Sequence, residues 1–309
     1  MIEVFSKRTD KPRSYPFLKP SETGVGSRKY LSFNPIEFST STDGKTWTSY
    51  YDVKNLEGVY CYRAPDVPQA KRTDNVKKIG FQDGSRLMST TFDSRQLKIE
   101  LLFHGVDETD SLLAFESAQR FLVARDPYWI AFGNWQNRMY YGTATMGDPN
   151  YLSDRAWSCE VTFTDLMGLS RSIGTSLSST EDMWGVNDNI PNNGDYPSYS
   201  FSSNSFSVYN LSDVLIDPER RGHPFKMTCK GSSGGNFKVT NKTTGDEIYK
   251  KSAFNGTFVL NGVNPELDGT GCLLDTDCGI ITLQIGKNDF EVENFTGTIS
   301  FDFPMWWLS

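Results

Sequence analysis

One segment with helical periodicity lies between long tracts that alternate like β-strands, and it constrains the fold of this chain more than any other feature. Before it, apolar and polar side chains alternate over residues 97–103, as in a strand with one buried face. Residues 107–110 then supply short side chains that accept hydrogen bonds at a helix start. Apolar residues recur three and four apart until Pro127, which cannot continue a helix. The pattern predicts one helix, over approximately 108–125, packed on a β-sheet.

Length and composition favour a mainly β protein with two domains. A chain of 309 residues exceeds the size that one core usually serves. The aromatic share of 14% and the 26 Gly residues favour short strands joined by tight turns. Because no apolar run approaches ~20 residues, we expect no membrane contact. Residues 1–10 lack the apolar core of a signal peptide, so we expect no export by the general route.

The domain organisation follows from a change in composition. Residues 174–205 are dominated by Ser, Asn, Asp, Gly and Pro, which cannot build a core of their own. We therefore predict an N-terminal domain over 1–185, a polar joint over 186–205 and a C-terminal domain over 206–309. Apolar alternation in the last part, with turns every ~8 to 12 residues, predicts a β-sandwich.

A long excursion is predicted at approximately 63–92. Residues 64–68 contain two prolines that break regular structure, and four basic residues follow. Loops of this length without their own core tend to be functional or to pack on another chain. The alternative is a mobile basic loop without a partner.

The sequence offers no convincing site for chemistry. The two His residues, His104 and His223, lie beside glycines and are expected to be turn residues. Cys272 and Cys278 lack the further ligands of a zinc site. The acidic residues at 268, 275 and 277 lack the spacing of a calcium loop. We expect no catalytic residue, no metal and no cofactor. A hydrolase that uses an unidentified carboxylate pair stays open, because such a pair is defined by its separation in space.

Aromatic residues near the joint and at the end of the chain allow two interpretations. Tyr196, Tyr199, Trp306 and Trp307 could stack on sugar rings, as in a lectin. Alternatively, the two tryptophans cap the sandwich core or lie at an interface. We favour the second interpretation, because large aromatic side chains seldom stay exposed without a partner.

The order of these features resembles the distal tail proteins, called Dit, of siphophages that infect Gram-positive bacteria. The resemblance rests on the predicted helix and on short motifs in both halves of the chain. These motifs are FDSRQLKI at 92–99, PYWI at 127–130, YNLSD at 209–213, IDP at 216–218, GHP at 222–224, LQIGKN at 283–288 and ISFDF at 299–303.

This resemblance implies an N-terminal β-sandwich-like domain with one helix and an extended belt loop, followed by a C-terminal galectin-like β-sandwich. The first domain would close a homo-hexameric ring through the belt. The belt residues expected at the ring interface are Arg63, Asp66, Val67, Lys71, Arg72, Lys77 and Lys78. Head-to-tail contacts of this kind close into rings when the rotation allows it.

The same resemblance implies a structural role in the virion and no catalysis. The ring would join the tail-tube protein to the tail-tip hub, or tail-associated lysin, and to the receptor-binding protein. It would be made in the host cytoplasm. DNA would pass through its open centre without specific binding, and a formal net charge of −7 fits that expectation. The alternative function is a carbohydrate-binding module for host cell-wall glycans.

Overall fold

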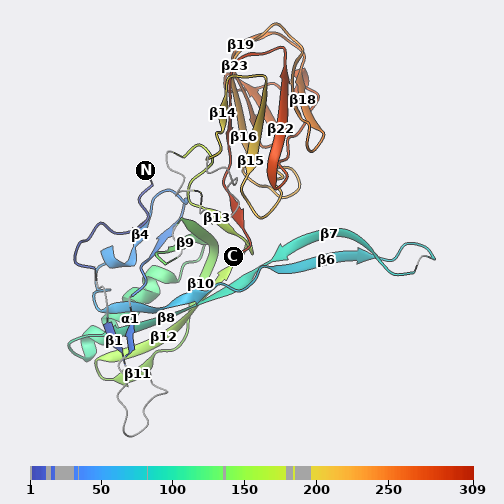
Figure 1. Cartoon of the computed structure of the whole chain (residues 1–309). Coiled ribbons are helices and arrows are strands. Elements are labelled where there is room, and N and C mark those ends of the chain that lie inside the picture. The colour runs from blue at the N-terminus through green and yellow to red at the C-terminus, as the bar shows by residue number, and fades with distance from the viewer. Residues whose placement is uncertain are drawn as a thin grey trace. The chain divides into compact units, whose positions relative to one another are not determined.

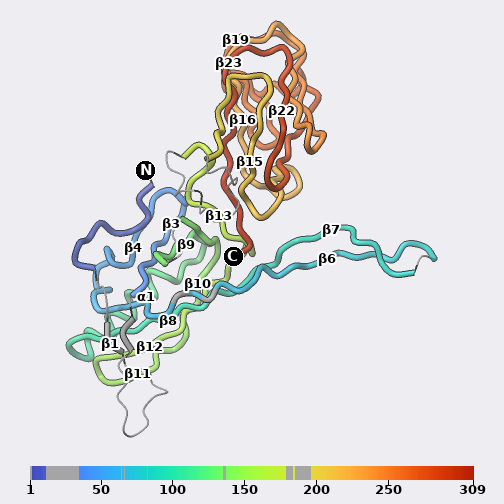
Figure 2. Tube along the Cα trace, in the orientation of Figure 1, coloured from blue at the N-terminus to red at the C-terminus, as the bar shows by residue number. Residues whose placement is uncertain are grey.

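The helix and the strands around it in sequence share one core. A computed structural model describes residues 2–11, 15–17, 31–33, 35–81, 83–134, 137–178, 184 and 196–309. The chain divides into two compact units, Ile2–Ser170 with Ser309, and Arg171–Leu308 (Figures 1 and 2). The described part is mainly β and contains one α-helix, as the sequence predicts.

The first unit is built on an antiparallel sheet with the strand order β4-β3-β9-β10-β12-β8-β5, in which β11 also pairs with β12. A separate pair, β1 and β2, lies earlier in the chain. The bounds are β1 (Tyr15–Phe17), β2 (Leu31–Phe33), β3 (Phe38–Ser41), β4 (Thr48–Ser49), the 3-10 turn η2 (Tyr50–Asp52), β5 (Val59–Asp66), β8 (Arg95–His104), β9 (Tyr128–Phe132), β10 (Arg138–Met146), β11 (Asn150–Ser153) and β12 (Ala156–Asp165).

Helix α1 (Glu108–Leu122) begins where the sequence predicts and covers this sheet. The Asp107 side chain accepts from the Asp110 N–H at 2.8 Å, which satisfies one free donor of the first turn. The helix ends three residues before the predicted 125, because Val123 adopts extended backbone torsions while its N–H still bonds to Gln119. On the buried side Trp157 donates to the Ser111 carbonyl at 3.1 Å, which ties the helix to β12.

The predicted alternation in β8 is confirmed. Its apolar residues at 97, 99, 101 and 103 are all buried, whereas Lys98 points to solvent. They pack with α1 and with the fully buried strand β9. One face of the sheet therefore forms the core of the first unit.

The second unit is a sandwich of two antiparallel sheets, ordered β14-β23-β16-β19-β20-β21 and β15-β22-β17-β18. Rings from opposing sheets meet in its core: Phe290 and Phe301 lie 5.0 Å apart, and Phe237 and Phe258 lie 5.5 Å apart. The bounds are β13 (Ser170–Ser172), β14 (Ser200–Phe201), β15 (Ser205–Asn210), β16 (Lys226–Ser233), β17 (Phe237–Asn241), β18 (Asp246–Lys250), β19 (Phe254–Asn261), β20 (Asn264–Leu267), β21 (Thr270–Gly271), the 3-10 turn η4 (Leu273–Asp275), β22 (Gly286–Glu293), β23 (Thr296–Asp302) and β24 (Trp306–Trp307).

The second unit begins earlier than the predicted boundaries. Ser172 donates its N–H to Met305 and Ser176 donates to Phe303, both at 2.8 Å, although 1–185 was assigned to the first domain. Strand β14 pairs with β23, although 186–205 was assigned to a joint. The polar composition of these segments does not predict strands, because backbone N–H and C=O groups can pair whatever side chains they carry. Residues 185–195 of the predicted joint lie outside the described residues.

Candidate interaction surface

The predicted excursion is a β-hairpin. Strands β6 (Lys71–Lys77) and β7 (Arg86–Asp93) pair antiparallel from Lys71 opposite Asp93 to Lys77 opposite Arg86. The prediction of a belt loop over 63–92 is therefore corrected to a two-stranded ribbon, here named the projecting ribbon (residues 71–93). Figure 1 shows it leaving the sheet of the first unit as one long extension.

The first residues of the predicted loop belong to a strand of the sheet. Strand β5 continues to Asp66 and pairs with β8 through two shifts in register. Pro65 is tolerated there because β5 lies at the edge of the sheet, where one side needs no backbone donor. Pro65 therefore lies within an irregular strand and does not end it, whereas Pro68 lies beyond the strand.

Apart from the pairing of its two strands and a few polar side-chain contacts, the projecting ribbon buries little of its surface. Every residue of β6 is exposed, and most of β7 is exposed as well. An isolated two-stranded hairpin is marginal in water, and both of its edges carry unpaired backbone groups. A partner surface would stabilise the hairpin and would also offer hydrogen-bond partners to the backbone groups at its edges.

The far half of the projecting ribbon carries apolar side chains that nothing covers. Phe81 in the turn is fully exposed. We name the set the apolar tip, and its members are Val76, Ile79, Phe81, Leu87 and Met88, each exposed in the chain alone. Single exposed apolar residues are ordinary, but five of them on one extended hairpin are typical of a protein–protein contact.

The residues predicted for the belt fall into two groups. Lys71, Arg72, Lys77 and Lys78 lie on the projecting ribbon and are exposed. The other three belong to its root: Arg63 and Asp66 are part of β5, and Val67 packs against the core of the first unit. Sequence reasoning missed the apolar tip. Apolar residues in a segment that has no core of its own could have indicated it.

A buried ion pair lies at the root of the projecting ribbon. Arg95 begins β8 and Asp165 ends β12, opposite each other in register. Arg95 Nε donates to Asp165 Oδ2 at 3.0 Å, and the two side chains are 2% and 0% exposed. Burial raises the pKa of Asp165, and the neighbouring Arg95 charge offsets part of this rise. A second Arg95 nitrogen donates to the Pro68 carbonyl at 3.0 Å, so one side chain joins the entry and the exit of the ribbon.

A glycine holds the other side of the root. Gly168 has a φ of +66°, and a Cβ there would lie 2.1 Å from the carbonyl oxygen of Asp93, the last residue of β7. Only a residue without a side chain permits this approach. The turn after β12 thus lies against the backbone of the ribbon at the point where the ribbon leaves the sheet.

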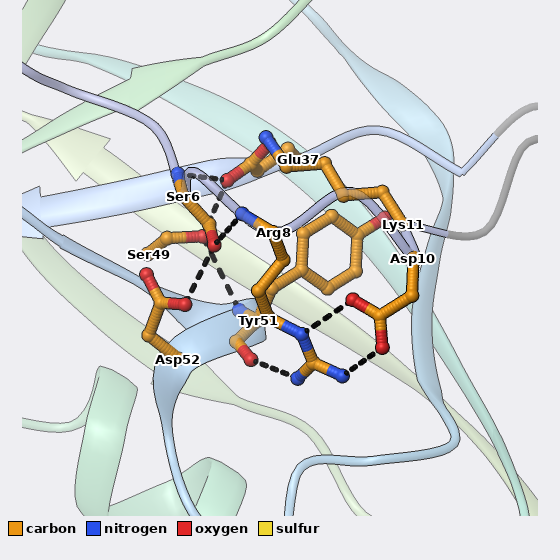
Figure 3. A network of polar contacts seen from close by, with 8 residues as sticks. All are labelled: Ser6, Arg8, Asp10, Lys11, Glu37, Ser49, Tyr51 and Asp52. Carbon is orange, nitrogen blue, oxygen red and sulfur yellow. Dashed lines mark hydrogen bonds and ion pairs between the residues drawn. The ribbon is translucent and has the colours of Figure 1, made fainter.

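A second polar cluster fastens the N-terminal segment to the first unit (Figure 3). Glu37 accepts from the Ser6 N–H, the Ser49 hydroxyl and Lys11 Nζ, each at 2.6 Å. Arg8 donates to the Tyr51 carbonyl at 2.9 Å. With three donors on one carboxylate, this cluster binds the segment 2–11 in place and is structural.

The cavity beside this cluster, about 180 Å³, does not have the features of an active site. Its charged lining residues are Arg8, Asp10, Lys11 and Glu57, of which Arg8 and Asp10 bind each other through two contacts of 2.9 and 2.8 Å. This pairing lowers the pKa of Asp10 to about 2. A carboxylate held ionised by its neighbour is poorly suited to proton transfer near neutral pH.

The aromatic residues considered for glycan binding are mostly buried. Tyr199, Trp306 and Trp307 are 3%, 4% and 2% exposed, so their faces are closed to a sugar ring and that interpretation is wrong for them. Trp306 stacks on His223 at 5.0 Å, and Trp307 donates to the Trp184 carbonyl at 3.2 Å. Only Tyr196, of these four, is exposed, and its role stays a prediction.

Two of the remaining candidates for chemistry, His223 and Asp275, have structural partners. His223 Nδ1 accepts from the Asp217 N–H at 3.2 Å, and burial lowers the pKa of His223 to about 4. Asp275 pairs with the buried Lys250. Among the described residues, no three His, Cys, Asp or Glu side chains are grouped to hold a metal. None of the helices described is long and apolar enough to cross a membrane.

Two β units, a helix on the first sheet and a projecting ribbon together define a Dit-like fold. The structure is similar to the SPP1 Dit (gp 19.1) protein, with a TM-score of 0.59 and 16% identity, over 87% of this chain and 99% of that chain. That protein is described as a paradigm of the hub adsorption apparatus in phages that infect Gram-positive bacteria. The resemblance noted in the sequence is thus confirmed at the level of the fold.

Two weaker similarities involve the phage P2 baseplate in its activated conformation. The structure with Ca gives a TM-score of 0.39 and 13% identity, over 87% of this chain and 98% of that chain. The structure with Sr gives 0.38 and 13%, over 87% and 97%. No family model matches the chain, and no curated protein matches it.

Proposed function

We propose that this chain is a structural hub protein of a phage tail tip, and that its copies close into a hexameric ring through the projecting ribbon. The observation that carries the proposal is the exposed ribbon with its apolar tip. The fold shared with SPP1 Dit, a protein of the hub adsorption apparatus, supports the same role.

The mechanism is mechanical. A ribbon that leaves one side of a subunit and docks on a different surface of the next copy makes a heterologous contact, which closes into a ring or continues as a filament. The clamp formed by Arg95, Asp165 and Gly168 fixes the base of the ribbon, so that each copy presents it in one orientation. Orientation fixed at the root favours one closed ring over a mixture of assemblies.

In this proposal the ring lies at the virion tail tip. It joins the tail-tube protein to the tail-tip hub or tail-associated lysin and to the receptor-binding protein, and DNA passes through its centre. A net charge of −7 lets a polyanion pass without strong attachment. The chain is proposed to have no enzymatic activity.

The test compares assembly with and without the ribbon. Full-length protein is measured by size-exclusion chromatography with light scattering, beside a variant in which residues 72–92 are replaced by a short Gly-Ser linker. We expect a ring for the natural chain and a folded monomer for the variant. Rings that survive the replacement would show that the ribbon does not close them.

A matched pair of point variants separates the apolar tip from general surface effects. Phe81→Ser removes an exposed apolar side chain from the ribbon, and Leu274→Ser removes one from the second unit. We expect Phe81→Ser alone to weaken assembly, by about tenfold or more in the midpoint concentration, as for a central interface aromatic. Equal effects of the two changes would contradict the proposal.

A further inference from the structure

We infer that the apolar tip docks on the outer face of the first turns of α1 in a second copy of the chain. This inference rests on the proposed ring and names the surface that receives the ribbon. The receiving surface, here named the helix patch, consists of Val106, Leu112 and Leu113, with the acidic residues between 106 and 116 around them.

The helix patch is apolar and uncovered. Val106 is 79% exposed, Leu112 54% and Leu113 46%, while Ala114 and Ala118 on the other side of the same helix are buried. A helix of a globular protein normally keeps its exposed face polar. Three exposed apolar residues, one just before α1 and two in its first half, therefore indicate a surface that another molecule covers.

The ribbon of the same copy does not reach the helix patch. In Figures 1 and 2 the turn between β6 and β7 and the start of α1 lie at opposite ends of the first unit. Donor and receiver on opposite sides of one subunit make the contact heterologous, which is the arrangement that a closed ring requires.

The two surfaces have opposite charge. Residues 76–88 contain three basic residues and one acidic residue, a formal charge of +2. Residues 106–116 contain four acidic residues and no basic residue, a formal charge of −4. In the described part of the chain no ion pair involves Lys77, Lys78 or Glu108, while Glu116 pairs with Arg120 on its own helix. Opposite potentials of this kind set partner choice and register at an interface.

Two other exposed apolar groups of the first unit fit the tip less well. Leu166 and Met167 lie directly before Gly168, at the root of the ribbon itself. Residues 147–155 around Tyr151 and Leu152 contain two acidic residues and one basic residue, a formal charge of −1, so they offer less negative charge to a basic ribbon than residues 106–116 do. The helix patch combines apolar exposure with uniform negative charge.

A charge exchange tests the contact in the full-length chain. Lys77→Glu with Lys78→Glu changes the formal charge of residues 76–88 from +2 to −2. Glu108→Lys, Thr109→Lys and Glu116→Lys, all at exposed positions, together change the formal charge of residues 106–116 from −4 to +1 and keep the apolar side chains. We expect each set of changes alone to raise the midpoint concentration of assembly at least about tenfold, by light scattering. The five changes combined should restore assembly to within about threefold of the natural chain, because attraction returns with the signs exchanged.

A control and the unfolding curves make the outcomes separable. Glu219→Lys makes the same charge change at an exposed position of the second unit and should leave assembly unchanged. Urea unfolding of each variant verifies that the first unit still folds. If the Gly-Ser replacement of the ribbon abolishes rings but the helix-patch variants assemble normally, the proposed function stands and the helix patch is the wrong receiver. If the natural chain forms no ring, both proposals fail.

Discussion

Replacing Asp165 by Asn tests the clamp at the root of the projecting ribbon most sharply. The change keeps the size of the side chain and removes its charge. Arg95 keeps its bond to the Pro68 carbonyl, but its guanidinium side chain, 2% exposed, then loses the charge of Asp165. Removing one charge of a buried pair is the dominant cost of such a change.

The size of the loss in the free energy of unfolding follows from the burial of this ion pair. Removing one partner of a buried pair costs about 3–5 kcal/mol of the free energy of unfolding. An Asn carbonyl can still accept from Arg95 Nε, so we expect a value near the lower end, about 3 kcal/mol. With two compact units the chain is not expected to unfold in one step, so the first unit is followed by hydrogen exchange in β8 and β12 during urea unfolding.

An exposed pair provides the matched control for this change. Asp10→Asn removes the same group from the pair with Arg8, whose side chains are 44% and 68% exposed. Because solvent screens exposed pairs, we expect no measurable shift of the unfolding midpoint. The double variant Arg95→Met with Asp165→Leu removes both charges and should recover much of the lost stability. An Asp165→Asn variant as stable as the natural chain would refute the reasoning.

Two further changes test the root and the second unit. Gly168→Ala forces a Cβ against the Asp93 carbonyl and should lower the free energy of unfolding by more than about 2 kcal/mol. Gly222→Ala has a similar φ, +64°, but open space around it, so it should cost only the backbone strain of about 1 kcal/mol. Equal costs in urea unfolding would contradict the close approach. The pKa of His223 is about 4 in the folded chain against 6.5 in the unfolded chain. As the pH falls, the unfolded state therefore takes up a proton first. The free energy of unfolding should fall by up to about 3 kcal/mol from pH 7 to pH 4. His223→Asn keeps an acceptor for Asp217 and should lose this pH dependence; unchanged dependence would refute it.

Local pattern predicted the parts of the fold that follow from local physics. Alternation over 97–103 and the cap at Asp107 each act within a few residues, and each is confirmed in the structure, whereas the helix ends at Leu122, before Pro127 is reached. The ribbon was located as an excursion but not recognised as two strands. Its first strand reads KRTDNVK and has no buried face, so it shows no alternation to detect.

The parts that could not be predicted depend on contacts between distant residues. Arg95 and Asp165 are 70 positions apart, and only the register of β8 against β12 brings them together. The burial of Trp306 depends in the same way on the distant Ser212, whose hydroxyl accepts a hydrogen bond from the backbone N–H of Trp306 at 3.0 Å. Neither relation leaves a periodic signal in the sequence.

Particle images of the purified full-length chain test the central claim most directly. The account predicts closed rings with an open centre, built from copies joined head to tail through the ribbon. Isolated monomers at high concentration, or rings whose ribbons project freely without touching the next copy, would contradict it.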